Sequence, residues 1–587
     1  MVERRDNPRL GAHLFRFAVI SDTHVNPADD HCNSPFPVNA RANRRFRHLV
    51  GELNQRDLDF VLHLGDLVHP IPASGDLYAR AAQAYRAIIA ELKVPIHVIP
   101  GNHDIGDKPG AGGPVPSTSM ADIASWESEF GAHYTSFETG GMRFVLLNAQ
   151  LINSGLPQEA LQKDWADALL ATGQRSVVAL HHPPFICTAD EPDHYDNLQQ
   201  PGRDWVLELA ARPGVELTLS GHAHNFWYDR VGKAEYYRLP AISFVRQDYS
   251  EMLRAAPGSE TEFGRDDTAK LGYMIIDVFE KGHATQIVRT YGAERGIGEV
   301  SAAPKPLAPS PRISRPLIGF DLRQNWAELT EIAPSGALDE FDRKTARNDY
   351  PLMGLIEMGV QRIRLPLADL RDPLRRDRLD ALVGLGFRPT LFCLGFPHDD
   401  GLSEIRRHAF DSIEVALPRE HIPELTSLPQ VDLPVFISPI HAHTQAENGI
   451  RKHTIEHGFE VTDTAILEHL SNLRDHGAAG FVVREFAGSV TVKWWQDVRA
   501  LREKTDLSLS LHLRTGGPDP ARETEDCSAT LCALDILAQD VPEKTSIFVD
   551  TLITQDRGYF PRPGALCPAH NPSEISAAVA RANSSKG

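Results

Sequence analysis

The sequence predicts an α/β protein with two domains: a two-sheet sandwich in the first half and a (β/α)8 barrel of the TIM type in the second. Three observations predict this architecture. The 587 residues are too many for one ordinary core. A proline-rich stretch at 301–316 divides the chain into two parts of domain size. On both sides of it, short apolar runs alternate with segments of helical periodicity.

These boundaries define the expected domains. We place the first domain at 1–300, an extended linker at 301–316 and the second domain at 317–587. Each half has enough apolar runs for a core of its own. We therefore expect the halves to be separable.

The composition excludes several classes of protein. Hydrophobic residues make up 42% and charged residues 24%, which argues against a disordered, fibrous or membrane-embedded chain. The net charge of −19 disfavours an extended nucleic acid as a partner. The six cysteines form no C-x-x-C pair and indicate reduced thiols. Neither an apolar leader nor a run of about 18 apolar residues is found, so we expect a cytoplasmic protein without a membrane partner.

The first half has the pattern of a sandwich of two buried sheets. Its apolar runs indicate strands at 15–20, 60–64, 96–99, 144–147, 177–180 and 215–219. Helical periodicity appears at 45–53, 77–92, 159–170 and 205–211. Two further strands, near 236–244 and 273–279, follow each other without a helix between them, which favours two sheets over one.

The second half repeats strand and helix more regularly. Eight strand-like runs lie at 317–322, 362–367, 389–394, 413–417, 435–440, 480–483, 507–513 and 546–552. Helical patterns separate them, which is the count of a (β/α)8 barrel. An open, doubly wound sheet is the alternative.

Residues able to bind metal follow five of the first-half strands, where each strand ends. They are Asp22 and His24, Asp66, Asn102 with His103 and Asp104, His181 with His182, and His222 with His224. Each motif alone has an ordinary structural explanation. Together, carboxylates, imidazoles and an amide at the carboxyl ends of strands predict one metal site. The mixture suits Mn, Fe or Zn.

This five-part pattern resembles the calcineurin-like metallophosphoesterase superfamily over about residues 14–291. It is most similar to the branch containing bacterial cyclic-nucleotide phosphodiesterases and purple acid phosphatases. The resemblance implies a four-layer αββα sandwich and two divalent metal ions. It assigns Asp22, His24 and His224 to one ion, assigns Asn102, His181 and His222 to the other, and makes Asp66 their bridge. The histidine two positions before the proline is the family's ligand, which selects His181 over His182.

The resemblance also implies a mechanism. Two ions hold a bridging hydroxide that attacks phosphorus, and the histidine of the G-N-H motif, His103, protonates the leaving alkoxide. Asp104 follows directly and either orients that imidazole or is a plain turn residue.

Loops after the strands supply candidate substrate-binding residues. Arg41 follows the long first loop, His194 lies between the two histidine motifs, and Arg246 and Tyr249 follow a strand after the H-x-H segment. Each of them is equally compatible with a solvated or packing role.

Polar residues also end the predicted barrel strands. They are Asp321, Arg323, Arg364, His441, His443, Glu485, His512, Arg514 and Asp550. His441, His443, Glu485 and His512 have the composition of a second metal site. We favour the alternative that this half recognises substrate or builds a dimer.

Three functions remain open. One is a metal-dependent phosphoesterase with an accessory barrel, and another is a bifunctional enzyme whose barrel processes the released product. A scaffold with a dead site is disfavoured because every ligand position is filled. We expect a small phosphoester as substrate and favour a phosphodiester over a phosphomonoester by analogy. A homo-oligomer is compatible with the sequence.

Overall fold

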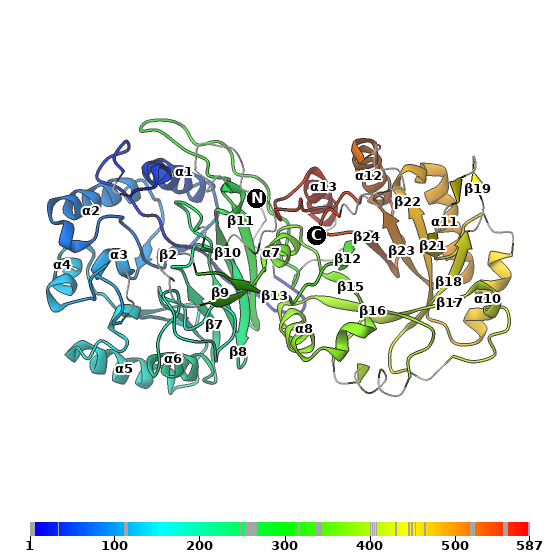
Figure 1. Cartoon of the computed structure of the whole chain (residues 1–587), viewed down its shortest axis with the longest axis horizontal. Helices are drawn as coiled ribbons and strands as arrows, with labels where there is room; N and C mark the ends of the chain where they lie inside the picture. Colours follow the sequence, from blue (N-terminus) through cyan, green and yellow to red (C-terminus); the bar gives the residue numbers. More distant parts are fainter. Residues whose placement is uncertain are drawn as a thin grey trace. The chain divides into compact units, whose positions relative to one another are not determined.

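The structure is a computed structural model whose chain divides into two compact units (Figure 1). It describes residues 6–584 except 33, 111–114, 247, 250–251, 253–266, 314–316, 335–342, 399–400, 402, 404, 407, 429–430, 444–445, 448–449, 452–453, 463–464, 517–522 and 556–561. No helix in this described part is both long and apolar enough to cross a membrane.

The division differs from the expected boundaries. The first unit comprises Met1–Leu307 together with Glu328–Met353, and the second comprises Ala308–Ala327 and Gly354–Gly587. The chain therefore leaves the first unit near the expected linker, whose residues 314–316 lie outside the described part, and then returns to it.

The first unit contains two sheets, as the sequence predicts. The first sheet has the order β11-β10-β1-β2-β3, and the second has the order β4-β5-β6-β7-β9-β8. The first sheet is formed by β1 (His13–Ile20), β2 (Phe60–His63), β3 (Ile96–Val98), β10 (Gly272–Phe279) and β11 (Gly282–Arg289). The second is formed by β4 (Thr135–Thr139), β5 (Met142–Leu146), β6 (Ser176–Ala179), β7 (Val215–Ser220), β8 (Trp227–Val231) and β9 (Ala234–Arg238).

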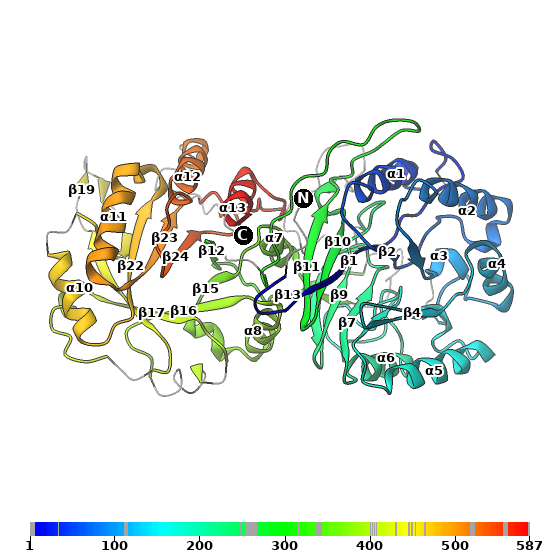
Figure 2. The same cartoon turned by 180° about the vertical axis from the view of Figure 1, so that it is seen from behind.

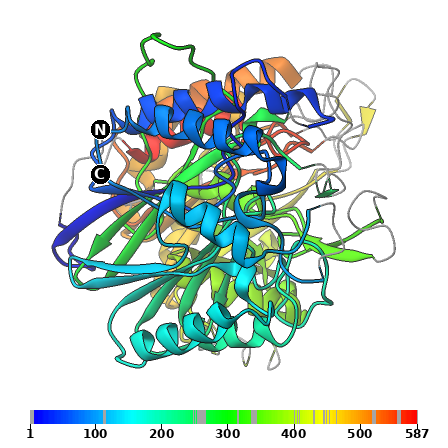
Figure 3. The same ribbon diagram turned by 90° about the vertical axis from the view of Figure 1, so that its left-hand side faces the viewer.

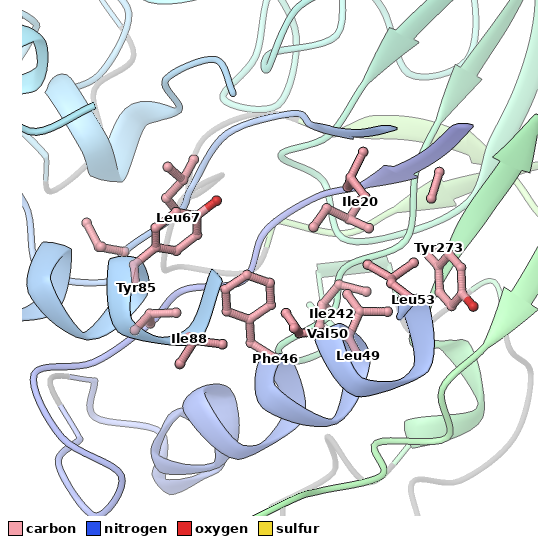
Figure 4. Close-up of a cluster of buried hydrophobic side chains, with 14 of the residues drawn as sticks. Ile20, Phe46, Leu49, Val50, Leu53, Leu67, Tyr85, Ile88, Ile242 and Tyr273 are labelled. Atoms are coloured by element: carbon pink, nitrogen blue, oxygen red, sulfur yellow. The ribbon is translucent and has the colours of Figure 1, made fainter. Parts of the chain in front are cut away.

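Helices cover the outer faces of both sheets, which confirms the four-layer sandwich. The helices are α1 (Ala42–Leu53), α2 (Asp76–Ile89), α3 (Asn102–Ile105), α4 (Met120–Phe130), α5 (Pro157–Leu170) and α6 (Gly202–Ala210). Figure 3 shows the blue helices α1 and α2 above the sheets and the cyan helices α5 and α6 below them. Helix α1 places Phe46, Leu49, Val50 and Leu53 on one face, the spacing of an amphipathic helix (Figure 4).

Aromatic side chains fill the space between the two sheets. Phe17 of β1 stacks on Phe60 of β2 with ring centroids 4.9 Å apart. Phe144 of β5 meets the edge of Phe17 at 5.2 Å and stacks on Phe137 of β4 at 4.6 Å. This contact fixes the two sheets against each other, so that the ends of their strands share one edge of the unit.

The returning segment, Glu328–Met353, is bound tightly to the first unit. It contains the antiparallel pair β13 (Leu329–Ile332) and β14 (Lys344–Arg347). The indole N–H of Trp227 donates to the carbonyl of Arg347 at 2.6 Å, and the backbone N–H of Tyr228 donates to Asp349 at 3.0 Å. The guanidinium of Arg347 lies 2.8 Å from Asp229. Both Arg347 and Asp349 are buried, so these contacts are part of the unit's interior.

The second unit is a closed barrel of parallel strands, which confirms the predicted barrel and excludes the open sheet. The strands run β12-β15-β16-β17-β18-β22-β23-β24, and the pairing of β24 with β12 closes the ring. They are β12 (Ile318–Asp321), β15 (Arg362–Pro366), β16 (Arg388–Leu394), β17 (Ser412–Pro418), β18 (Val435–His443), β22 (Gly480–Phe486), β23 (Ser508–Arg514) and β24 (Thr545–Asp550).

Helices lie around the outside of this barrel (Figure 2). They include α8 (Pro373–Leu385), α10 (Ile466–Asp475), α11 (Val492–Thr505), α12 (Glu523–Leu537) and α13 (Glu574–Ser584), and α7 (Tyr350–Glu357) crosses the boundary between the units. Short strands β19 (Ala446–Glu447), β20 (Ile450–Arg451) and β21 (Thr454–His457) follow β18.

Candidate metal centre

The residues that the sequence predicts as metal ligands lie together at the strand ends of the first unit. Asp22 and His24 follow β1, Asp66 follows β2, Asn102 follows β3, His181 follows β6, and His222 with His224 follow β7. All of these side chains are buried. The first three strands belong to one sheet and the last two to the other, so both sheets contribute to the centre.

The backbone at this centre is held in an unusual conformation. Five of the seven residues have positive φ: Asp22 (56°), His24 (45°), Asp66 (54°), His222 (69°) and His224 (55°). Such a conformation costs a residue with a Cβ about 1–3 kcal/mol and persists where the surrounding structure imposes it. Its concentration at one edge of the sandwich indicates a functional site.

Two glycines allow the loops to come this close. Gly65 has a φ of 97°, and a Cβ at this position would lie 2.7 Å from Nδ1 of His181. A Cβ on Gly101 would lie 2.2 Å from a carboxylate oxygen of Asp66. Both positions therefore require glycine.

Asp22, His24, Asp66 and His224 form one group of possible metal ligands. One ligand atom from each residue lies within 4.8 Å of the others. Nε2 of His24 is 3.1 Å from Nε2 of His224, and Oδ1 of Asp22 is 3.3 Å from the same nitrogen of His224. Oδ1 of Asp22 is buried and accepts no hydrogen bond from the described residues. Two imidazoles and two carboxylates facing one another fit a divalent cation.

A second group lies on the other side of Asp66. Oδ1 of Asn102 is 3.2 Å from Nε2 of His181 and 3.1 Å from Nδ1 of His222. Oδ2 of Asp66 is 3.5 Å from Nε2 of His181, and the same oxygen is 3.5 Å from Nε2 of His24. One carboxylate oxygen therefore faces both groups, as a bridging ligand would.

Electrostatics in the centre suit metal binding. Burial lowers the pKa of His24 well below its ordinary value, which favours the neutral imidazole that binds metals. Burial would also lower the pKa of His181, but the charge of Asp66 and its hydrogen bond raise that pKa to about 9. A divalent ion would compete with this proton for the ring nitrogen of His181.

His182, the neighbour of His181, has different partners. Its Nδ1 is 2.7 Å from Nε2 of Gln150, and its ring stacks on His222 with centroids 3.7 Å apart. Its Nε2 is 3.6 Å from Asp107. His182 nevertheless belongs to a buried group of three histidines, with His181 and His222, whose ring nitrogens lie within 4.8 Å of one another and could hold a metal.

His103 lies beside the centre, and His69 holds it there. The backbone N–H of His103 donates to Asp66 at 2.9 Å, and its ring Nδ1 is 2.6 Å from the carbonyl oxygen of His69. The side chain is only half-buried. Nδ1 of His69 is in turn 3.3 Å from Nδ1 of His24. His69 cannot be identified from the sequence, because a histidine three positions after Asp66 belongs to no recognisable motif.

The sequence left two roles open for Asp104, orienting the ring of His103 or serving as a plain turn residue, and its carboxylate makes a third kind of contact. Its carboxylate accepts hydrogen bonds from the backbone N–H groups of Leu67, Val68 and Gly101, at 2.8–3.2 Å. Burial and the charge of Asp66 raise the pKa of Asp104 to about 8. Asp104 thus ties the loop after β2 to the loop after β3.

Two of the four candidate substrate residues meet near the centre, at Asp196. Arg246 contacts Oδ1 of this fully buried carboxylate at 2.5 Å, and the hydroxyl of Tyr249 donates to Oδ2 at 2.7 Å. The ammonium of Lys344, from β14, also lies 2.7 Å from Oδ2. Asp196 in turn is 3.7 Å from Nε2 of His222. The sequence gives no signal for Asp196 or Lys344 because their partners are distant in the chain.

The other two candidates make different contacts. The ring of His194 is 3.1 Å from Glu191, and its Nδ1 accepts the backbone N–H of Asp196 at 3.1 Å, so it shapes a turn. Arg41 is partly exposed and lies 3.8 Å from Glu294. The structure does not bring Arg41 to the centre.

Among the described side chains, the polar strand ends of the barrel do not gather into the metal site considered from the sequence. Nε2 of His441 faces the carbonyl of Gly458 at 2.8 Å, and Glu485 accepts the backbone N–H of Phe486. His512 lies 3.0 Å from Glu414. The side chain of His443 lies outside the described part. Within that part, all groups able to hold a metal are in the first unit.

Comparisons with known proteins agree with this geometry. The family described as "Calcineurin-like phosphoesterase" matches residues 15–226. A rat protein named "Serine/threonine-protein phosphatase CPPED1" is 30% identical over 185 residues, which are 30% of this chain and 56% of that protein. Its cattle counterpart is 32% identical over the same shares. The chain thus spans about half the length of these relatives.

Two more distant similarities each cover less than half of the chain. A "Probable cyclic nucleotide phosphodiesterase" of Synechococcus is 27% identical over 199 residues, 33% of this chain and 69% of that protein. A solved dimetal phosphatase from Danio rerio is 14% identical, with a TM-score of 0.33, over 47% of this chain and 96% of that one.

Proposed function

Because residues 15–226 of this chain are a calcineurin-like phosphoesterase domain, we propose that the protein hydrolyses a small phosphoester at a centre of two divalent metal ions. The first ion would be held by Asp22, His24 and His224, and the second by Asn102, His181 and His222, with Asp66 between them. Manganese, iron and zinc suit this mixture of oxygen and nitrogen ligands.

The position of Asp66 carries the proposal. Its Oδ2 atom lies 3.5 Å from Nε2 of His24 and 3.5 Å from Nε2 of His181, so one oxygen serves both ligand groups. A carboxylate that only stabilised the fold would need no imidazole on each side. When bound, two divalent ions would activate water and neutralise charge on the phosphoryl oxygens.

His103 is the proposed general acid. Its ring is half-buried beside His24, with centroids 4.7 Å apart, and the carbonyl of His69 fixes its Nδ1. If Nδ1 carries a proton donated to that carbonyl, Nε2 is the nitrogen that exchanges a proton with the leaving group.

Phosphodiesters remain our preferred substrate class, because the combination of motifs in the sequence favours them by analogy. Phosphomonoesters are the second candidate, because the relatives at 30–32% identity are named phosphatases and the relative named as a phosphodiesterase is at 27%. Activity on bis(p-nitrophenyl) phosphate and on p-nitrophenyl phosphate separates the two.

The test combines metal analysis with these assays. The purified chain should contain two divalent ions, and Asp66→Asn should lose metal and most of its activity on both esters. Asp59→Asn is a matched control, because Asp59 lies at the opposite end of β2. Full metal content with normal turnover in Asp66→Asn would refute the proposal.

A further inference from the structure

The interior of the barrel contains a layer of charged residues that the proposed phosphoesterase function does not use. Arg364 of β15 donates to Glu414 of β17 at 2.5 Å and to Asp321 of β12 at 2.9 Å. Glu414 also lies 3.0 Å from His512 of β23. Strands β17 and β23 are not neighbours in the closed ring, so these side chains meet across the barrel interior.

Such a layer is unusual for a structural core. Barrel interiors are generally filled by branched apolar side chains. Asp321, Arg364, Glu414 and His512 are each at most 4% exposed. Buried ion pairs are often no more stabilising than apolar residues of the same size, so stability alone does not explain them.

A second set of charges lies nearer the carboxyl ends of the strands, around Asp550. This residue ends β24, and its carboxylate accepts two hydrogen bonds from Arg323, one of them at 2.7 Å. Arg562 donates to it at 2.8 Å and Arg484 of β22 at 3.1 Å. Three guanidinium groups therefore share one carboxylate.

The two sets together hold more positive than negative charge. Arg323, Arg364, Arg484 and Arg562 are linked to Asp321, Glu414 and Asp550, four guanidinium groups to three carboxylates. Arg484 uses one of its three nitrogens on Asp550. Burial lowers the pKa of Arg484 to about 10, and the neighbouring arginines add to this effect against the charge of Asp550.

One carboxylate oxygen in this cluster has no hydrogen-bond partner among the described residues. Oδ1 of Asp321 is buried and accepts no hydrogen bond from the described residues, although Oδ2 binds Arg364. A ligand hydroxyl would satisfy this oxygen, because an unpaired buried acceptor is costly. Arginine is the side chain best suited to planar recognition of carboxylate and phosphate.

We propose that the carboxyl end of the barrel binds a small hydroxylated compound carrying a phosphate or carboxylate group, through Arg323, Arg484 and Arg562, with Asp321 accepting a hydroxyl. This is the end of a barrel at which ligand sites are found. The site is independent of the metal centre, because all of these residues belong to the second unit.

Calorimetric titration of the full chain tests the proposal, with glycerol 3-phosphate and glycerate as separate probes. Arg484→Gln and Arg562→Gln should each weaken binding of the preferred probe at least tenfold. Arg474→Gln is the control and should leave binding unchanged, because Arg474 is an exposed residue of α10 that pairs with Asp475. The circular dichroism spectrum and the unfolding temperatures of all three variants should match those of the unchanged chain, which shows that the barrel is folded, and hydrolysis of p-nitrophenyl esters by the first unit should be unchanged.

The outcomes distinguish the two ligand groups. A loss confined to glycerol 3-phosphate assigns the site to phosphates, and a loss confined to glycerate assigns it to carboxylates. Asp321→Asn, as a separate variant, should also weaken binding of the preferred probe. If binding of both probes is the same in Arg484→Gln, Arg562→Gln and the unchanged chain, the proposal is wrong.

Discussion

The ammonium of Lys344 lies 2.7 Å from Oδ2 of Asp196, a residue 148 positions earlier in the sequence. Both side chains are buried, and the other carboxylate oxygen of Asp196 is 3.7 Å from Nε2 of His222. The segment that returns to the first unit therefore supplies a positive charge next to a proposed metal ligand. This relationship links residues beyond the expected linker to the chemistry of the phosphoesterase domain.

Substituting Lys344 should impair the second metal site. In Lys344→Met, Asp196 keeps its contacts with Arg246 and Tyr249 but loses one of its two cations. Its carboxylate should therefore shift, and His222 should lose its orientation. We expect about 1–3 kcal/mol of lost stability and a lower content of the second metal, measured by thermal unfolding and metal analysis.

Two variants make this result specific. Lys344→Arg should restore most of the metal content, because it keeps the charge. Arg343→Met removes the neighbouring exposed cation, whose partner is Glu331, and should behave like the unchanged chain. Equal metal content in Lys344→Met and Arg343→Met would contradict a role for Lys344 at the metal centre.

Fragments of the chain should depend on the same segment. A fragment of residues 1–307 lacks the partners of Trp227, Tyr228 and Asp229, whereas a fragment of residues 1–353 keeps them. We expect the shorter fragment to unfold at a lower temperature and bind less metal. Equal unfolding temperatures and metal contents would show that the returning segment is dispensable, as the sequence alone suggests.

The sequence predicts those parts of the protein that depend on local pattern. Apolar runs ending in residues such as Asp22 and His24 identify both the strands and the proposed ligands that follow them, because the parallel strands of each sheet end at a common edge. The regular strand and helix repeat similarly predicts the barrel.

Other features could not be predicted because they depend on distant contacts. The strands β13 and β14 are short and carry no distinctive alternation, so residues 328–353 read as part of the second domain. Lys344 and Asp196 each look like ordinary surface residues until the fold pairs them. Arg41 is a candidate from the sequence because it follows a long loop, and the structure places it partly exposed, 3.8 Å from Glu294.

Replacing His103 should slow the hydrolysis of esters with poor leaving groups more than that of esters with good leaving groups. His103→Ala should keep both metals, because the seven ligands are intact, and should lose about 10²–10⁴-fold in kcat on alkyl phosphoesters. On p-nitrophenyl esters the loss should be much smaller, because that leaving group needs little protonation. His97→Ala, at a half-buried histidine of β3, is the control. Equal losses on both kinds of ester would argue against an acid role.

Removing the metals should destabilise the first unit. Chelation leaves buried carboxylates such as Asp22 and Asp66 without their proposed cations, and ligands that bind only the folded state stabilise it by mass action. We expect the unfolding temperature to fall on chelation and recover with added Mn²⁺ or Zn²⁺. Asp66→Asn should respond little, whereas an equal response in both proteins would place the stabilising metal elsewhere.

Acid should weaken the loop that carries Asp196, through Glu191. Burial would raise the pKa of Glu191, but hydrogen bonds from His194, Asn197 and the backbone of Ile186 lower it from 4.5 to about 2. A depressed carboxyl pKa stabilises the folded state above the unfolded value of 4.5, and this stabilisation is lost as the pH falls toward 2. Such a shift corresponds to about 3 kcal/mol.

The free energy of unfolding of Glu191→Gln, measured in urea, should therefore differ from that of the unchanged chain by about this amount at pH 6. The difference should shrink steadily below pH 4.5. Glu208→Gln, at an exposed carboxylate of α6, should show no such trend. A difference between Glu191→Gln and the unchanged chain that stays constant from pH 6 to pH 3 would mean that Glu191 is not the group that titrates.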